Sequence, residues 1–180
     1  NEDEKLKLFK SVKDAVGTTA SVIAGTTDNN TIASIDLSKK AEKLGVDAIL
    51  LTVPAYNKPT QEGLFQHFKK ISESVSIPGI LYNVPSRTSL NMDVDTTIKL
   101  SSIDNIVGVK EASSDPDQIT NIISRANSDF KIWSGNDNET FSIMSTGGHG
   151  VVSVASNIIG NQVKKLMGYI LDGQTDLAAT

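Results

Sequence analysis

The apolar run at residues 105–111, NIVGVKE, constrains the fold of this chain more than any other stretch. Its apolar residues are mostly β-branched and consecutive, which is typical of a strand buried on both faces of a parallel sheet. Such a strand needs neighbouring strands and helices that cover the sheet. The rest of the sequence is therefore expected to supply both at regular intervals.

Strand-like and helical stretches alternate along the whole chain. Six strand-like runs alternate with seven helical stretches, at a repeat of about 20–30 residues. The strands are predicted at residues 20–25, 47–53, 78–82, 105–111, 130–133 and 151–154. The predicted helices include residues 6–16, 32–44, 60–75, 94–100, 116–126, part of 137–147 and 163–171. Strict alternation predicts a parallel sheet with right-handed crossovers.

We interpret this pattern as a (β/α)8 TIM barrel of which about six βα units are present. A doubly wound sheet is the alternative, but no Gly-x-Gly-x-x-Gly turn is present for a dinucleotide. Six strands cannot close an eight-stranded barrel, so we expect the first two strands before Asn1. The chain also starts without methionine, in an acidic helical turn, and stops without a clear finishing element. Residues 1–180 are therefore expected to be a partial barrel domain of a longer protein.

Composition excludes several classes of function. A formal net charge of −4 gives no basic face for nucleic acid. The chain has no cysteine, which excludes disulfides and thiolate chemistry, and its two histidines argue against a histidine-rich metal site, so we predict no metal. No apolar run approaches the roughly 18 residues of a membrane span, and no signal peptide opens the chain. We expect a soluble, cytoplasmic protein without a membrane partner.

Polar side chains follow the predicted strands at their carboxyl ends, the rim where parallel sheets place their chemistry. Lys110 ends its strand, and an ammonium group near an apolar interior loses hydration, so its pKa falls and the neutral amine can attack a carbonyl. Tyr82 ends the preceding strand and can carry protons for that reaction if its phenol is within hydrogen-bond reach. Arg87 follows in the loop at residues 83–88, and its planar fork suits a carboxylate or a phosphate.

Each of these residues also has an ordinary structural interpretation. A strand-end lysine is usually solvated, a tyrosine can fill the barrel interior, and an arginine in a polar loop can lie at the surface. Glu111 is the next residue on the strand and points away from Lys110, so we predict a structural role for it. His149 is expected in a turn at the opposite end of the sheet, and His67 is expected to be solvated on its helix.

Five segments of the chain resemble the dihydrodipicolinate synthase family. They are PAYNKPTQEG at residues 54–63, LYNVPSRT at 81–88, GVKEA at 108–112, SGND at 134–137 and GGHGVVS at 147–153. The similarity covers essentially the whole chain in order and keeps the intervals, which is far more specific than any single motif. The resemblance implies a class I aldolase-type barrel that condenses pyruvate with L-aspartate 4-semialdehyde to 4-hydroxy-tetrahydrodipicolinate, on the diaminopimelate route to lysine.

The resemblance implies catalytic roles for three residues. Lys110 would form an imine with pyruvate, and Tyr82 would shuttle the protons. Tyr56, which precedes an exposed turn, would cross a subunit interface to complete the proton relay. The resemblance therefore also implies a homo-oligomer, either a tetramer or a dimer.

Three further residues are expected to bind substrate. Arg87 would anchor the carboxylate of L-aspartate 4-semialdehyde, and Gly135 and Val152 would contact substrate, with Val152 in the wall of the pyruvate pocket. An iminium is itself an electron sink, so the implied reaction requires no metal, flavin or other cofactor.

The chain departs from the family pattern at its ends. The family's Gly-Thr-Thr-Gly-Glu loop belongs to the second barrel strand and would lie before Asn1. Thr26 and Thr27 are not that loop, because they would follow the third strand. The family's C-terminal helical extension is also expected to be absent from residues 1–180.

A second departure concerns the lysine feedback site of sensitive family members. Asn29 is retained, but other positions of that site differ from the family pattern. The differing positions are occupied by Glu2, Lys5, Ala33 and Ala55. We therefore predict weak or absent inhibition by lysine.

Two other functions remain open at this stage. A sister pyruvate aldolase, of the N-acetylneuraminate lyase or 2-keto-3-deoxygluconate aldolase type, shares the lysine and the tyrosine, although Arg87 favours a short acidic aldehyde over a sugar. A catalytically silent barrel fragment is the non-enzymatic alternative, in which two strand edges would be unpaired.

Overall fold

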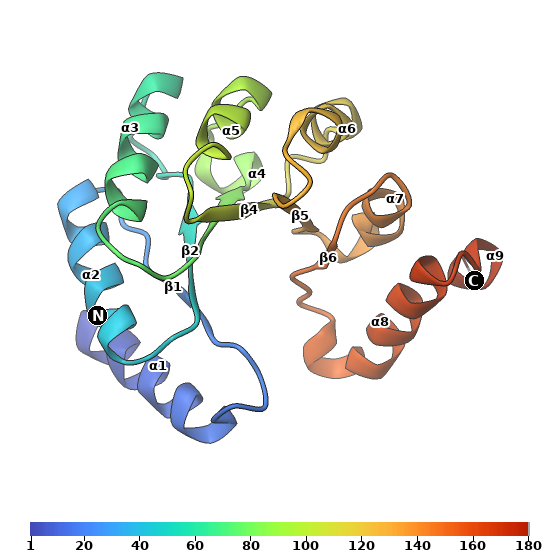
Figure 1. The fold of residues 1–180 in the computed structure, drawn as a ribbon, viewed down its shortest axis with the longest axis horizontal. Helices are drawn as coiled ribbons and strands as arrows, with labels where there is room; N and C mark the ends of the chain where they lie inside the picture. The colour runs from blue at the N-terminus through green and yellow to red at the C-terminus, as the bar shows by residue number, and fades with distance from the viewer. Residues whose placement is uncertain (180) are drawn as a thin grey trace.

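The computed structural model describes residues 1–179, which contain one parallel sheet of six strands in chain order (Figure 1). The strands are β1 (Ile23–Gly25), β2 (Ala48–Thr52), β3 (Gly79–Asn83), β4 (Ile106–Glu111), β5 (Lys131–Ser134) and β6 (Gly150–Val151). Each strand pairs with the next one along the chain, so β1 and β6 stand at the two ends of the sheet. The sheet curls with helices on its outer side, which confirms the predicted partial (β/α)8 barrel.

Helices connect the strands. They are α1 (Glu2–Val16), α2 (Thr31–Lys43), α3 (Gln61–Ser72), α4 (Pro85–Thr88), α5 (Val94–Leu100), α6 (Pro116–Arg125), the 3-10 turn η1 (Asp137–Glu139), α7 (Thr140–Ser145), α8 (Ser156–Leu171) and α9 (Thr175–Ala178). Thr60 caps α3 by accepting a hydrogen bond from the backbone N of Gly63, and Asp115 caps α6. Within residues 1–179, no helix is long and apolar enough to cross a membrane.

The apolar core lies between the sheet and its helices. Leu51 on β2, Leu81 on β3 and Val109 on β4 are each fully buried on this side of the sheet. Phe68 of α3 and Leu100 of α5 belong to the same cluster. Fully burying a side chain of this size contributes about 1.5–3 kcal/mol, so this layer holds the fold together.

The inner face of the curled sheet is less covered. Leu50, Tyr82 and Trp133 point to this side and are only half-buried. Strand β4 is the best-covered strand, and Val107 alone among its residues is half-buried. The sequence prediction of a strand buried along its length is therefore confirmed for β4.

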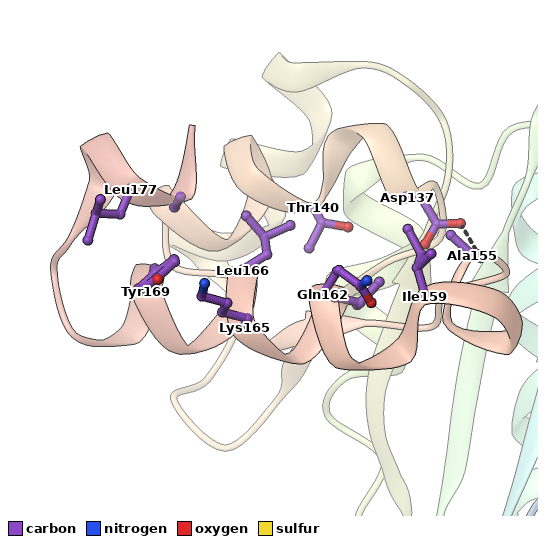
Figure 2. A pocket seen from close by; sticks show the side chains of 11 residues that line it. Asp137, Thr140, Ala155, Ile159, Gln162, Lys165, Leu166, Tyr169 and Leu177 are labelled. Carbon is purple, nitrogen blue, oxygen red and sulfur yellow. Dashed lines mark hydrogen bonds between the residues drawn. The ribbon is translucent and has the colours of Figure 1, made fainter. Parts of the chain in front are cut away.

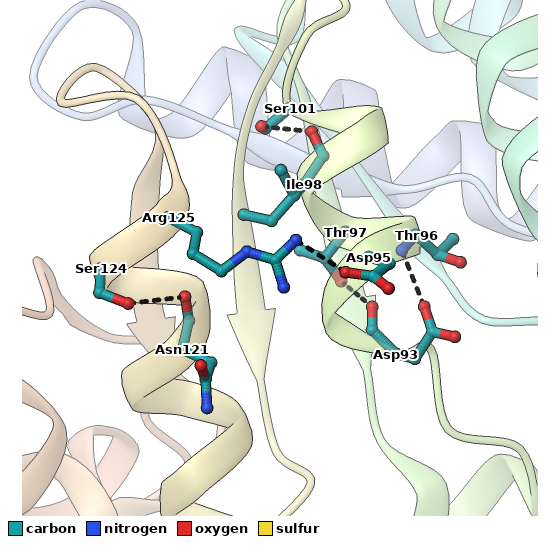
Figure 3. Close-up of polar contacts among 9 residues, drawn as sticks. All are labelled: Asp93, Asp95, Thr96, Thr97, Ile98, Ser101, Asn121, Ser124 and Arg125. Atoms are coloured by element: carbon teal, nitrogen blue, oxygen red, sulfur yellow. Dashed lines mark hydrogen bonds and ion pairs between the residues drawn. The ribbon is translucent and has the colours of Figure 1, made fainter.

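Polar contacts join neighbouring helices at the surface, as between α5 and α6 (Figure 3). Arg125 of α6 pairs with Asp95 of α5, with 2.7 Å between Nη2 and Oδ1. Asp93 caps α5 by accepting a hydrogen bond from the backbone N of Thr96 at 2.7 Å. Exposed ion pairs contribute about 0–1 kcal/mol, so these contacts add little to the apolar core.

Several predicted boundaries were wrong. Strand β1 begins at residue 23 rather than 20, and β6 ends at residue 151 rather than 154. Helix α4 forms inside the segment that was predicted to be a loop. It starts at Pro85, whose fixed φ suits the first helical position, and stops at Ser89, which has a left-handed φ of 60°.

The structure also corrects the prediction for His67, which is 6% exposed rather than solvated. Its ring packs edge-on against Phe68, and its Nδ1 shares a hydrogen bond of 2.9 Å with the hydroxyl of Thr31 at the start of α2. Burial lowers the pKa of His67, so the ring is neutral near pH 7. His149 lies in the turn before β6, as predicted, with its ring edge-on to Trp133.

Candidate active site

Lys110 on β4 and Tyr82 on β3 are neighbours in the parallel register, at the carboxyl ends of their strands. The Nζ atom of Lys110 lies 4.0 Å from the centre of the Tyr82 ring. No hydrogen bond or ion pair joins it to a side chain in residues 1–179, and it faces the ring of Tyr82. Lys110 is 9% exposed, which rules out the solvated lysine that the sequence left as an alternative.

The electrostatic surroundings favour a neutral amine on Lys110. Burial lowers the pKa of Lys110, the positive charge of Arg87 lowers it further, and the negative charge of Asp137 opposes both. Burial raises the pKa of Tyr82, and the charge of Arg87 opposes that rise. The phenol is therefore protonated near pH 7, and a depressed pKa for Lys110 increases the fraction of amine that can act as a nucleophile.

Gly135, which follows β5, lies directly against the lysine side chain. Its backbone N donates a hydrogen bond of 2.7 Å to the backbone oxygen of Glu111. A Cβ atom at this position would lie 3.2 Å from Cε of Lys110 and 2.7 Å from Cβ of Ala112. Any larger residue would therefore displace the lysine or the end of β4.

Val152 and Asp137 form the next part of the rim. The backbone N of Val152 donates to the backbone oxygen of Ser134 at 2.9 Å, which places Val152 beside the end of β5. Oδ2 of Asp137 accepts hydrogen bonds from the backbone N of Val154 and of Ala155, each at 3.0 Å. These contacts tie the loop after β6 to the loop after β5.

Asp137 was not among the site residues predicted from the sequence, although it follows a strand end. Hydrogen bonds from Ser153 and from two backbone N–H groups hold the pKa of Asp137 below its usual value, so it is ionised and supplies the negative charge that Lys110 senses. Its other oxygen, Oδ1, is buried and accepts no hydrogen bond from residues 1–179. The sequence alone could not single out Asp137 among the polar residues that follow the strands. Its role depends on contacts that form only in the folded chain.

Arg87 lies on α4, and a backbone hydrogen bond joins the end of this helix to the loop that carries Tyr56. Arg87 is exposed on α4, and its charge reaches both Lys110 and Tyr82. The backbone N of Tyr56 donates to the backbone oxygen of Thr88 at 3.4 Å. The Tyr56 side chain is 92% exposed and does not join the Lys110 cluster, and its backbone has a left-handed φ of 72°.

The structure therefore places Tyr82 and Gly135 against Lys110. Val152 and Arg87 lie on the same rim, whereas Tyr56 points into solvent. Glu111 lies on the opposite face of β4, as predicted, and is fully buried. The fold and the site together define a parallel βα-barrel protein with a candidate amine nucleophile at the carboxyl rim. More specifically, the chain belongs to the dihydrodipicolinate synthetase family, whose model matches residues 1–180.

The chain is also similar to individual proteins that are named as synthases of this family. The 4-hydroxy-tetrahydrodipicolinate synthase 1 of Halalkalibacterium halodurans is 55% identical over 177 residues, which cover 98% of this chain and 60% of that protein. The crystal structure of dihydrodipicolinate synthase DapA-2 from Bacillus anthracis matches with a TM-score of 0.97 and 46% identity, over 99% of this chain and 61% of the other. The chloride-inhibited dihydrodipicolinate synthase from Acinetobacter baumannii, complexed with pyruvate, matches with a TM-score of 0.96 and 37% identity, over 99% and 62%. This chain thus spans about 60% of the length of the relatives that it matches.

Proposed function

We propose that residues 1–180 are a partial barrel catalytic domain of a cytoplasmic 4-hydroxy-tetrahydrodipicolinate synthase. The reaction condenses pyruvate with L-aspartate 4-semialdehyde and releases water. The names of the relatives and the match of the family model support this reaction. The single observation that carries it is the buried Lys110 amine, which has a lowered pKa and lies 4.0 Å from the Tyr82 ring.

Lys110 acts as the nucleophile in this proposal. Its neutral amine adds to C2 of pyruvate, and the resulting carbinolamine loses water to give an iminium ion. Loss of a proton from C3 then gives an enamine, whose C3 attacks the aldehyde carbon of the second substrate. The amino group of that substrate finally attacks C2, which closes the ring and releases Lys110.

The neighbouring residues assist these steps. Tyr82 carries protons to and from the carbinolamine, because its phenol lies on the strand next to Lys110. Arg87 binds the carboxylate of L-aspartate 4-semialdehyde, for which a guanidinium has the matching fork. Gly135 and Val152 form the wall against pyruvate. Tyr56 joins the proton relay of a second copy of the chain, in a homo-oligomer that is a tetramer or a dimer, as its exposed position suits.

Borohydride trapping of the full-length protein tests the proposal. Incubation with pyruvate and borohydride should add one reduced pyruvate to Lys110, which mass spectrometry of the digested protein locates. Lys110→Arg is the control, because it keeps a positive charge but provides no nucleophilic amine, and it should trap none. Turnover with L-aspartate 4-semialdehyde, compared with a sugar aldehyde, separates a synthase from a sister aldolase. Absence of an adduct on Lys110 would refute the proposal.

A further inference from the structure

Glu111 follows Lys110 on β4, and its carboxylate is fully buried on the helix side of the sheet. It accepts hydrogen bonds from donors on β3, on α6 and in the loop after β4. The backbone N of Ser113 donates at 2.8 Å, Nδ2 of Asn83 donates to both carboxylate oxygens at 3.1 and 3.3 Å, and Nε2 of Gln118 donates at 3.4 Å. Burial raises the pKa of Glu111, and the hydrogen bonds from Ser113, Asn83 and Gln118 oppose that rise.

The two side-chain amides cannot turn round, because their oxygen atoms are already used. Oδ1 of Asn83 accepts a hydrogen bond from the backbone N of Met92 at 3.0 Å. Oε1 of Gln118 accepts one from Nδ2 of Asn91 at 2.8 Å. Both amides therefore present N–H groups to Glu111. A glutamine at position 111 would direct its own N–H groups at these donors, and a buried unpaired donor costs about 1–3 kcal/mol.

The same cluster holds both ends of the segment at residues 84–92, which carries Arg87 on α4. One end follows Asn83 directly. At the other end, Oδ1 of Asn91 accepts from Nδ2 of Asn83 at 2.8 Å, and the backbone oxygen of Met92 accepts from the same nitrogen at 3.4 Å. Loss of the Glu111 carboxylate would therefore loosen the anchor of the Arg87 segment at both ends.

The side chains of Glu111 and Lys110 lie on opposite faces of β4, so the carboxylate does not contact the lysine amine. The groups that shift the pKa of Lys110 are its own burial, Arg87 and Asp137. The hydrogen bonds of Glu111 run instead to Asn83 and Gln118, which hold the segment that carries Arg87. We therefore expect Glu111 to influence the reaction through this segment.

We infer that Glu111 is a positioning residue that fixes the Arg87 guanidinium relative to Lys110 and so determines binding of the carboxylate-bearing aldehyde. The inference rests on the proposed function. It adds a residue on the helix side of the sheet that affects binding of L-aspartate 4-semialdehyde but not binding of pyruvate.

The first test is Glu111→Gln in the full-length protein, which keeps the size of the side chain and removes its charge. We expect the KM for L-aspartate 4-semialdehyde to rise about tenfold, because Arg87 is displaced. The KM for pyruvate and the amount of pyruvate that borohydride traps on Lys110 should stay at wild-type values. A similar rise in both KM values or an unchanged KM for the aldehyde would overturn the inference.

Asn91→Ala tests the same cluster without leaving a charge unpaired. Asn91 is an exposed residue, so the variant should fold, and we expect a smaller rise in the same KM. Asn121→Ala on α6 is the matched control, because Asn121 is exposed and its side chain, within residues 1–179, hydrogen-bonds only the backbone oxygen of Asp117 on its own helix. Equal effects of the two substitutions would contradict the inference.

A double-mutant cycle tests whether Glu111 acts through Arg87. Arg87→Ala should itself raise the KM for the aldehyde, and adding Glu111→Gln to that variant should raise it no further. Additive effects of the two substitutions would show that Glu111 acts by another route and would overturn the inference.

Hydrogen exchange separates this inference from the proposed function. Backbone amides in residues 84–92 should exchange faster in Glu111→Gln and in Asn91→Ala than in the wild type, whatever the activity of the enzyme. Unchanged exchange would refute the anchoring role. If wild-type protein traps no pyruvate, the proposed function fails, and the exchange measurement still decides whether Glu111 holds the segment.

Discussion

The two faces of the sheet differ in what they contribute. On the helix side, Leu51, Leu81 and Val109 are fully buried in one apolar cluster. On the inner side, Tyr82 is half-buried, and Nζ of Lys110 lies over the face of its ring. Successive side chains of a strand point to opposite faces of the sheet. The residues that stabilise the fold therefore lie on the helix side, and the candidate catalytic residues lie on the inner side.

The two charged residues at the end of β4 illustrate the difference. Glu111 on the helix side is surrounded by donors that stabilise its charge. Lys110 on the inner side is buried beside another cation, Arg87, and both effects lower its pKa. Hydrogen-bond donors stabilise the charged form of a buried carboxylate, whereas burial beside a like charge shifts an amine towards its neutral form.

The far end of the chain differs from both faces. Helix α8 has no fully buried residue and kinks at Ile159, and with α9 it lies beyond β6 (Figure 1). Together with α7 and Asp137 it borders a cavity of about 590 Å³ with mostly apolar walls (Figure 2). The observed packing on this side is thus much looser than under α3 and α5.

Tyr82→Phe should produce the largest effect and should act on the inner face alone. Removal of a proton-carrying hydroxyl is expected to lower kcat by about 10²–10⁴-fold. Stability should change little, because the ring and its contact with Lys110 remain. Steady-state kinetics and urea unfolding of the full-length protein measure the two quantities. A large loss of stability with little loss of kcat would contradict the assignment of catalysis to the inner face and of stability to the helix side.

Leu51→Ala should have the opposite effect, with a large loss of stability and little change in kcat. Truncation of this fully buried side chain should lower the free energy of unfolding by about 2–5 kcal/mol, since it removes apolar contacts and leaves a cavity. The kcat of the remaining folded protein should be close to that of the wild type. Leu8→Ala on α1, where the side chain is 64% exposed, is the control and should change stability by about 0.5 kcal/mol or less.

Gly135→Ala tests the point where the two faces meet. The added Cβ would lie 2.7 Å from Cβ of Ala112, so the end of β4 must shift, at a cost of about 1–3 kcal/mol. Trapping of pyruvate on Lys110 should also slow, because the lysine side chain is displaced. Gly168→Ala on α8 has open space around it and should be neutral or slightly stabilising. Wild-type trapping by Gly135→Ala would argue against a close fit around Lys110.

The smallest expected effects are opposite shifts in the pH dependence of trapping. Arg87 lowers the pKa of Lys110, so Arg87→Gln should raise that pKa and move the midpoint of pyruvate trapping to higher pH. Asp137 raises the pKa of Lys110, so Asp137→Asn should move the midpoint to lower pH. Asparagine keeps an oxygen that can accept from Val154 and Ala155, so the loop should hold. Shifts in the same direction would contradict the assigned charges.

Local sequence was sufficient for the order of the six strands and of the seven longer helices, although not for α4, and for the set of polar residues at the carboxyl rim. Periodicity identifies each element from its own residues, and a parallel sheet necessarily gathers the strand ends at one edge. The caps at Thr60 and Asp115 were predictable for the same reason, since each depends on a partner only three residues away.

Tertiary structure alone decided the surroundings of each rim residue. The donors around Glu111 include Asn83, which is 28 positions away, and the partner of His67 is Thr31, 36 positions away. Such contacts depend on how the helices pack against the sheet, and a short stretch of sequence cannot predict that packing. The sequence therefore determined which residues share the rim, and the packing of the folded chain determined which of them are buried, charged or held in place.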